Sequence, residues 1–224
     1  VFRYNDYDNI FENQLYLKYD LMRIDMAYLP NMAPKLFKPL NSQFLNFNNK
    51  FIKSLDDYMY VNDTFYSLPF DISSFVLMYR DDILNEQAFK RNYYEQTKLN
   101  NVIPTNLKEY NTLEEFIVNQ TGKEFYPSTV CYGASITVGN EFLARASNNN
   151  ILNSKGELNL DNKEVADILD KYYYSVINSK TKTNTFWNDV IKEYSEGKTL
   201  LSMVYTNYIY LLKDHPWFEV TYVA

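Results

Sequence analysis

Polar and aromatic side chains follow one predicted strand and suit the recognition of a polar molecule. Residues 200–205 are predicted as a strand, and Tyr205-Thr-Asn-Tyr208 comes directly after it. An aromatic ring such as that of Tyr205 stacks on a sugar face, while the amide of Asn207 donates and accepts hydrogen bonds. Tyr205 and Asn207 are therefore candidate ligand-binding residues, with a purely structural role given equal weight.

A second segment of this kind lies earlier in the chain. Residues 131–137 are small or β-branched and are predicted as a strand, which leads into Val138-Gly-Asn-Glu141 at the head of an apolar helix. A helix start exposes backbone N–H groups that suit hydroxyls or a carboxylate. Asn140 and Glu141 are the candidate ligand-binding residues of this segment.

Motifs for catalysis, cofactors and metals fail on inspection. Gly197-Lys-Thr199 resembles the end of a phosphate-binding loop, but Lys192 stands where its first glycine is needed, and the motif precedes a strand. One cysteine, Cys131, and one histidine, His215, make neither a Cys/His zinc site nor an internal disulfide. Adjacent carboxylates diverge on a helix or strand and do not converge on one bond; these pairs are Asp56-Asp57, Asp81-Asp82 and Glu114-Glu115. We expect no catalytic residue, no metal and no cofactor.

Composition limits the class of protein further. The 224 residues are 46% hydrophobic and 22% charged, which is ordinary for a folded protein. The formal net charge of −6 opposes contact with a nucleic-acid backbone by this segment, since such contact needs clustered Lys and Arg. No uncharged apolar run is long enough to cross a membrane.

The stretch from Val61 to Leu84 is the best guide to the organisation of the chain. Asn62 and Asp63 are turn formers and predict a hairpin. Pro69 fixes its own φ and favours an extended conformation at Leu68, so residues 67–70 predict a stiff segment that crosses between two lobes. The apolar run from 75 to 79 then predicts a strand buried on both faces.

Other segments complete an α/β pattern. Residues 21–28 are predicted as a strand that ends in a proline-containing loop with Asp25 and Tyr28. Ligands in open α/β sheets bind beyond such ends, so these two are candidate ligand-binding residues, with an ordinary surface loop given equal weight. Residues 1–4 and 218–223 are also predicted as strands. Helices are predicted within 7–19, 31–40, 44–60, 82–99, from Thr105 as a cap, from a capping box at 112–115, within 161–178 and within 187–194.

Several landmarks in this order resemble the extracellular solute-binding proteins of the maltose-binding type. They are Arg23-Ile-Asp-Met-Ala-Tyr28, Leu36-Phe-Lys-Pro-Leu40, Tyr66-Ser-Leu-Pro69, the strand that ends in Tyr79, Arg80-Asp-Asp-Ile-Leu84, Pro104-Thr105, Phe142 to Asn150, and Tyr194-Ser-Glu-Gly-Lys-Thr-Leu-Leu-Ser-Met203. The family's first strand and long C-terminal portion have no counterpart here, so we expect a fragment.

The resemblance implies an α/β, two-lobe, periplasmic-binding-protein-like fold of type II, present in part. Lobe 1 would include residues 1–67, lobe 2 residues 68–221, and 222–224 would begin a return crossing. The implied hinge is Ser67, Leu68, Pro69 and Phe70, with Asp71 and Ser73 as ligand contacts just past the crossing.

The implied function is binding of a small polar solute, a sugar or oligosaccharide, between the lobes for delivery to an ABC permease. The protein would then be extracytoplasmic, either lipid-anchored at the cell surface or periplasmic. Some regulators resembling this chain carry a GntR-type winged helix upstream. The alternative is therefore the ligand-sensing effector domain of a cytoplasmic transcriptional regulator.

Overall fold

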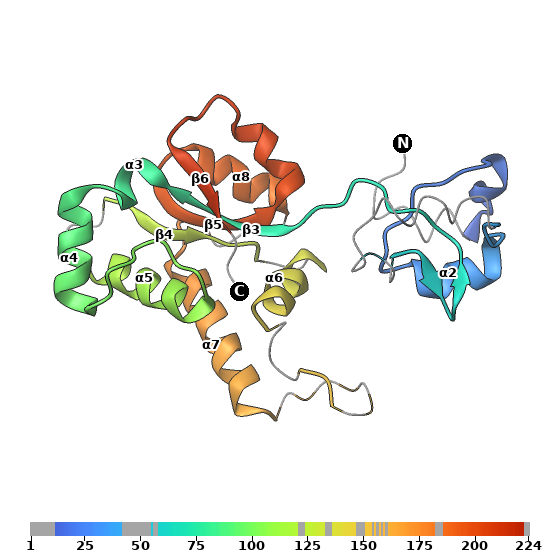
Figure 1. The fold of residues 1–224 in the computed structure, drawn as a ribbon, viewed down its shortest axis with the longest axis horizontal. Coiled ribbons are helices and arrows are strands. Elements are labelled where there is room, and N and C mark those ends of the chain that lie inside the picture. Colours follow the sequence, from blue (N-terminus) through green and yellow to red (C-terminus); the bar gives the residue numbers. More distant parts are fainter. Residues whose placement is uncertain are drawn as a thin grey trace. The chain divides into compact units, whose positions relative to one another are not determined.

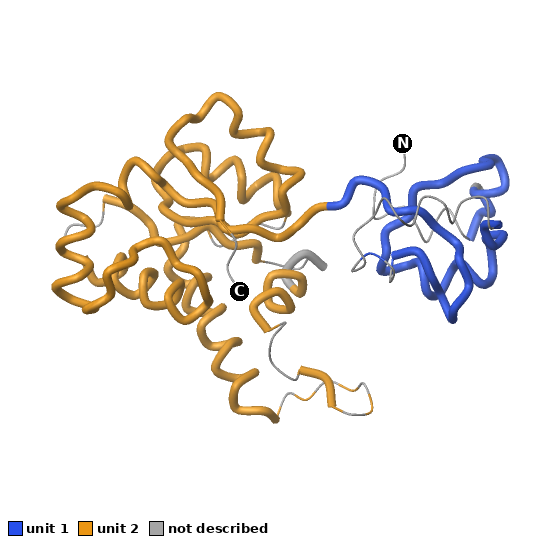
Figure 2. The backbone as a smooth tube through the Cα atoms, in the orientation of Figure 1, with its two compact units in different colours: residues 1–72 blue, residues 73–224 orange. Residues whose placement is uncertain are grey.

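The chain folds into two compact units, Val1–Ile72 and Ser73–Ala224 (Figure 2). The computed structural model describes residues 12–41, 55, 58–120, 124–132, 136–146, 151–153, 155, 157, 159, 161–181 and 186–221. The predicted strand at 1–4, most of the predicted helices within 44–60 and the predicted return crossing at 222–224 lie outside these residues.

The described residues of unit 1 form short elements. They are η2 (Leu15–Lys18), α2 (Leu29–Leu36), β1 (Tyr60–Val61) and β2 (Thr64–Phe65). The hairpin prediction is confirmed: β1 pairs with β2 antiparallel, and Asn62 and Asp63 have φ of 49° and 59°. Two left-handed residues in a two-residue loop match the strand twist, as in a type I′ turn.

The predicted strand at 21–28 is wrong. Residues 21–25 form no strand, and residues 26–28 turn directly into α2. The side chain of Asp25 accepts a hydrogen bond from the Ala27 N–H at 2.9 Å. Asp side chains that bond the backbone two residues ahead favour a turn over strand pairing.

Unit 2 is built on a four-stranded sheet with strand order β4-β5-β3-β6 (Figure 1). The strands are β3 (Phe75–Arg80), β4 (Tyr126–Thr129), β5 (Thr199–Tyr205) and β6 (Phe218–Thr221). β4 runs parallel to β5, whereas β3 runs antiparallel to both β5 and β6. The carboxyl ends of β4, β5 and β6 therefore lie at the edge where β3 begins, which we call the carboxyl edge.

Helices cover both faces of this sheet (Figure 1). They are α3 (Asp81–Leu84), α4 (Gln87–Thr97), α5 (Leu107–Asn119), α6 (Ile136–Ala146), α7 (Lys163–Asn178), α8 (Trp187–Ser195) and the 3₁₀ helix η5 (Thr206–Leu212). Leu77, Leu201 and Met203 pack with α4 and α5, while Met78 and Val204 pack with α8 and η5. All six residues from Thr199 to Val204 are buried, since β5 is covered on both faces.

Two sequence expectations in unit 2 are wrong, a strand at 131–137 and a helix cap at Thr105. The strand predicted at 131–137 lies at 126–129, and helix α6 already begins at Ile136. Pro127 argues against a strand in the sequence because proline cannot donate a hydrogen bond within a sheet, but β4 is an edge strand, where proline is tolerated. The cap of α5 is Asn106, not Thr105, because the Asn106 side chain accepts from the Glu109 N–H at 3.0 Å.

Two finer expectations for the helices also fail. Thr112 begins no helix, since it lies within α5 and its hydroxyl donates to the Lys108 carbonyl. The i, i+3, i+4 spacing within 161–178 predicts that Val165, Ile168, Leu169, Tyr172 and Val176 face a core. In α7, Val165, Tyr172 and Val176 are buried and Ile168 is half-buried, but Leu169 is 52% exposed.

Candidate functional site

The start of β3 and the end of β5 are joined side by side at the carboxyl edge. Phe75 is the register partner of Tyr205. Beyond that pair, the Thr206 N–H donates to the Ser74 carbonyl at 2.9 Å, and the Ser74 N–H donates to the Thr206 hydroxyl at 3.2 Å. This exchange holds Tyr205 and Thr206 in fixed positions at the edge.

Three aromatic rings pack against one another beneath this edge. The centroid of Phe75 lies 5.5 Å from that of Trp187 and 5.1 Å from that of Tyr205, and the rings of Trp187 and Tyr205 are 5.5 Å apart. All three pairs meet edge to face, the arrangement that aromatic quadrupoles favour. Trp187 is only 3% exposed, so it supports the half-buried Tyr205 from below.

A second aromatic pair belongs to the segments next to this cluster. Phe186, which is 40% exposed and precedes α8, lies 6.4 Å from the ring of Tyr208 in η5. Burial raises the pKa of the Tyr208 hydroxyl. The hydroxyl therefore remains a protonated hydrogen-bond donor at neutral pH.

The end of β4 is held from two sides. The Cys131 N–H donates to a Glu141 carboxylate oxygen at 3.3 Å, and the Tyr172 hydroxyl donates to the Cys131 carbonyl at 2.6 Å. These two bonds tie the strand to α6 and α7. Tyr132, the next residue, is 38% exposed.

Glu141 also belongs to a buried ion pair. The Arg145 Nη2 lies 2.8 Å from Glu141 Oε1, and the two side chains are 2% and 1% exposed. Burial raises the pKa of Glu141, and the guanidinium of Arg145 offsets only part of that effect. Burial alone would lower the pKa of Arg145, but the nearby carboxylates and Tyr110 outweigh it and raise that pKa, so the guanidinium stays charged.

A second buried carboxylate extends this network to α5 and α7. Glu114, which is 1% exposed, accepts hydrogen bonds from the hydroxyls of Tyr110 at 3.0 Å, Ser175 at 2.6 Å and Ser128. The hydroxyl of Ser175 in turn accepts from Arg145 Nη1 at 3.2 Å. The network therefore joins β4, α5, α6 and α7.

The structure brings some of the predicted site residues of unit 2 together and not others. Ser73, Tyr205 and Asn207 all lie at the carboxyl edge, and the Ser73 hydroxyl oxygen is buried without a hydrogen-bond partner among the described residues. Asn207 is exposed, and Asn140 is half-buried in α6. Glu141 is adjacent in sequence to Asn140, but its carboxylate is enclosed in the buried network.

The predicted residues of unit 1 lie in one neighbourhood of that unit. Arg23 makes an exposed ion pair with Asp71 at 2.7 Å, and its guanidinium lies 5.7 Å from the ring centroid of Phe70. Asp25 follows two residues after Arg23, and Tyr28 is the N-cap residue of α2. Unit 1 thus places Asp71 beside the segment that carries Asp25 and Tyr28.

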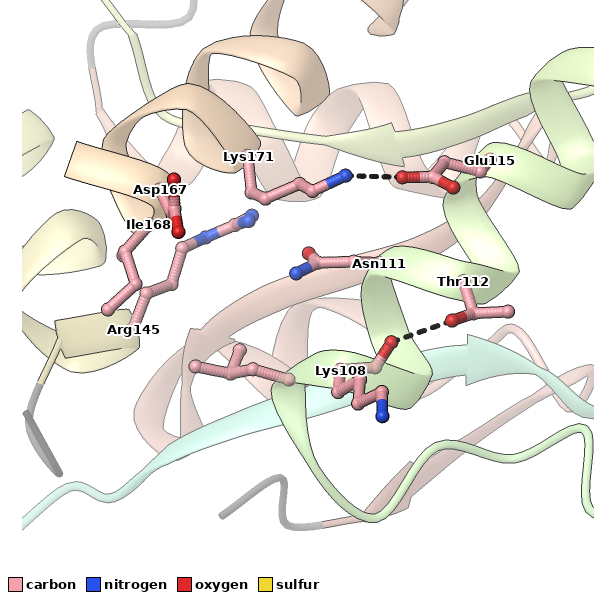
Figure 3. Close-up of a pocket in the computed structure, with 9 residues that line it drawn as sticks. Lys108, Asn111, Thr112, Glu115, Arg145, Asp167, Ile168 and Lys171 are labelled. Atoms are coloured by element: carbon pink, nitrogen blue, oxygen red, sulfur yellow. Dashed lines mark hydrogen bonds and ion pairs between the residues drawn. The ribbon is translucent and has the colours of Figure 1, made fainter. Parts of the chain in front are cut away.

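Unit 2 also has a cavity of about 420 Å³ between α5, α6 and α7 (Figure 3). None of the candidate ligand-binding residues predicted from the sequence lines this cavity. Its walls are formed by Leu107, Lys108, Asn111, Thr112, Glu115, Arg145, Asp167, Ile168 and Lys171.

In the part of the chain that the structure describes, no three His, Cys, Asp or Glu residues are grouped so as to hold a metal ion. Within the same residues, no helix is both long enough and apolar enough to cross a membrane.

Nearly the whole chain matches one known protein family. The family model described as bacterial extracellular solute-binding protein matches residues 14–224. The chain belongs to this family. The resemblance noted from the sequence is thereby confirmed, and the family is one of binding proteins and not of enzymes. No curated protein sequence matches this solute-binding chain.

Solved structures of sugar-binding proteins share the fold. The GacH receptor of Streptomyces glaucescens, studied unliganded and with acarbose, has 16% identity and a TM-score of 0.69 over 99% of this chain and 57% of its own. An ABC transporter solute-binding protein of Agrobacterium radiobacter in complex with ribitol has 14% identity and a TM-score of 0.69, over 97% and 58%. Maltose-bound MalE3 of T. maritima has 16% identity and a TM-score of 0.66, over 94% and 55%.

The likeness confirms the predicted fold class, a partial two-lobe α/β fold, because this chain spans less than three-fifths of each of these proteins. Neither the family match nor these structures support the alternative of a GntR-type effector domain.

Sequence reasoning missed several residues that shape the carboxyl edge of this solute-binding chain. The predicted strand includes Phe75 and the predicted helix includes Trp187, but neither prediction indicates that their rings pack against Tyr205. Thr206 lies between the candidates Tyr205 and Asn207, but the sequence does not indicate that its hydroxyl accepts a hydrogen bond from the Ser74 N–H. The Glu141–Arg145 pair has a visible signal, since the two residues are four apart in a helix and such pairs meet on one face.

Proposed function

We propose that this family member captures a small, polar solute, a sugar or an oligosaccharide, and that the carboxyl edge of unit 2 is one wall of the binding site. The observation that carries the proposal is the packing of Tyr205 against Phe75 and Trp187 at this edge. Ser73 and Asn207 belong to the two chain segments that are paired there. Open α/β sheets bind ligands beyond the carboxyl ends of their strands.

The chemistry of these side chains suits a sugar. A sugar ring presents an apolar C–H face, which an aromatic ring covers, and a rim of hydroxyls that both donate and accept hydrogen bonds. The buried Ser73 hydroxyl oxygen has no partner among the described residues, so a solute hydroxyl would satisfy it. Stacking and several hydrogen bonds are enough for a micromolar dissociation constant, which corresponds to about −8 kcal/mol.

The other proposed contacts follow from the resemblance. Asp25, Tyr28 and Asp71 of unit 1 are proposed to bind the same solute, together with Asn140 of α6. We propose that Glu141 supports solute binding indirectly. Its carboxylate accepts a hydrogen bond from the Cys131 N–H and so fixes the backbone that follows β4. Residues 67–70 are proposed as the hinge between lobes 1–67 and 68–221. Differential affinity of the solute for the closed state would drive closure.

The cellular role proposed for the whole protein is delivery of the solute to an ABC permease from outside the cytoplasm. Two structurally similar proteins belong to ABC transporters: the ribitol-bound protein of Agrobacterium radiobacter and the galacto-N-biose/lacto-N-biose I-binding protein of Bifidobacterium longum, bound to lacto-N-biose. A third, MalE3 of T. maritima, is bound to maltose. Membership of the extracellular solute-binding family supports the extracytoplasmic location. We propose that the protein is either lipid-anchored at the cell surface or periplasmic.

The experiment is a thermal-shift screen against maltose, lacto-N-biose and ribitol, which are ligands of matched proteins. A solute that binds the native state raises the unfolding free energy by about 2.7 kcal/mol at a hundredfold excess over its dissociation constant. We expect Asn207→Ala to reduce this shift without lowering the melting temperature of the free protein, because Asn207 is exposed.

The matched control is Asn119→Ala, which removes an exposed amide at the C-terminal end of α5. It should leave the shift unchanged. A full shift in Asn207→Ala, together with a full shift in Tyr205→Ala, would show that the carboxyl edge does not bind the solute.

A further inference from the structure

Three polar groups that line the cavity between α5, α6 and α7 have no hydrogen-bond partner among the described residues, and they belong to the buried Arg145, the half-buried Asn111 and the exposed Asp167. Arg145 Nε is buried and unbonded, although the other two guanidinium nitrogens bond Glu141 and Ser175. The side chains of Asn111 and Asp167 have no hydrogen bond or ion pair to any described residue. Buried polar groups are ordinarily satisfied, so an orphaned donor at the wall of a cavity calls for an acceptor there.

These groups converge from three helices. In Figure 3 the carboxamide of Asn111 extends from α5 into the space between the helices, toward Arg145 and Asp167. The guanidinium cannot turn away, because it lies 5.1 Å from the ring centroid of Tyr110 and 5.4 Å from that of Tyr172. The cavity thus holds a fixed donor, an amide and a carboxylate acceptor.

The charges around the cavity nearly cancel. Lys171 Nζ of α7 pairs with Glu115 of α5 at 2.5 Å, and Arg145 pairs with Glu141. Among the described lining residues, the charges that remain are one cation, Lys108, and one anion, Asp167. Such a cavity offers no net charge to an ion, and desolvating an ion there is costly.

We propose that this cavity is a second binding site, for a neutral hydroxylated molecule of the size of one sugar or sugar alcohol. Each hydroxyl both donates and accepts, so one hydroxyl accepts from Arg145 Nε–H while another donates to Asp167, and Asn111 can do both. Leu107 and Ile168 cover the C–H groups between the hydroxyls. The volume of about 420 Å³ falls in the lower part of the range for small-molecule sites, about 300–1,000 Å³.

This site goes beyond the proposed function and does not depend on it. No residue of the carboxyl edge lines the cavity, and a molecule bound there would join α5 to α7. It would also contact Arg145, whose partner Glu141 holds the end of β4.

The test is NMR titration of the ¹⁵N-labelled chain with D-mannitol and D-glucose at up to about 10 mM, which occupies about nine-tenths of a site with a dissociation constant of about 1 mM. We expect the Arg145 Nε–H and Asn111 side-chain amide signals to shift. Asp167→Ala should weaken binding about tenfold or more, the size of one hydrogen bond to a charged group. Asp167 is exposed enough for this change to leave the fold intact.

Two controls make the outcome specific. Asp170→Ala removes an exposed carboxylate of the same helix that does not line the cavity, and it should leave the affinity unchanged. Tyr205→Ala should leave the Arg145 and Asn111 shifts intact, which separates this site from the carboxyl edge. The proposal is overturned if neither signal moves, if Asp167→Ala binds as the wild type does, if glycine as a zwitterionic probe shifts the signals and the polyols do not, or if the shifts vanish in Tyr205→Ala.

Discussion

Removal of the Glu141 carboxylate is the sharpest structural perturbation available in unit 2. In Glu141→Ala, Arg145 keeps its charge in a site where its side chain is 2% exposed, and the Cys131 N–H loses its acceptor. Breaking one side of a buried ion pair costs about 3–5 kcal/mol, because the remaining charge is buried without compensation. A native domain is stable by only about 5–15 kcal/mol, so this loss is a large share of the total.

The assay is urea unfolding of the purified chain, followed by a probe within unit 2. With a slope of about 2 kcal/mol per M, a loss of about 4 kcal/mol lowers the unfolding midpoint by about 2 M. The matched control is Glu115→Ala, which removes the partner of Lys171. Those two side chains are 43% and 45% exposed, so the expected cost is below about 1 kcal/mol.

Two results would refute this reasoning. One is an equal midpoint shift for Glu141→Ala and Glu115→Ala, which would mean that the buried pair contributes no more than a surface pair. The other concerns the double variant Glu141→Gln with Arg145→Met, which removes both charges and keeps an acceptor for Cys131. It should recover much of the stability lost in Glu141→Ala, and equal or greater loss would contradict the assignment.

Three further predictions concern backbone conformation and pH. Gly197→Ala should cost about 1–3 kcal/mol in urea unfolding, because Gly197 has φ of 75° and an added Cβ would lie 3.3 Å from a guanidinium nitrogen of Arg80. Asp63→Gly should stabilise unit 1 against urea by up to about 1 kcal/mol, because a type I′ turn favours glycine at its second position. Hydrogen bonds from Arg80 lower the pKa of Asp82 in the folded state. The associated stability is therefore present above the unfolded-state pKa of about 3.9 and is lost as the pH falls through the folded value, so the wild type should lose stability more steeply than Asp82→Asn between about pH 5 and 3.

The sequence was sufficient where a strong local pattern decides the structure. The apolar run before Arg80 predicted β3, and Asn62-Asp63 predicted the hairpin turn. Glycine is typical just after a helix, so Gly197 predicts a helix end there, and α8 ends at Ser195 before β5 begins at Thr199. In each case the residues themselves restrict the backbone, so no distant partner is needed for the prediction.

The sequence was insufficient where the structure depends on pairing with a distant strand or on burial by other elements. Strand β4 contains Pro127 and is recognisable only as the edge neighbour of β5, whose first residue lies 73 positions after that of β4. The spacing of Glu141 and Arg145 is typical of an exposed helical pair, and only the packing of α5 and α7 around it makes the pair buried.

The two tryptophans of the chain lie at opposite ends of the strands of the sheet, so each reports on a different end. Trp187 packs against Tyr205 at the carboxyl edge, whereas Trp217 lies at the other end of β3, with the Arg80 guanidinium 4.4 Å from its ring centroid. The direct test of solute capture at the carboxyl edge is therefore titration of the ¹⁵N-labelled chain with maltose, lacto-N-biose or ribitol while both indole N–H signals are followed. We expect the solute that binds to shift the Trp187 signal and to leave that of Trp217 in place. A saturable shift of Trp217 with an unmoved Trp187 would contradict the account.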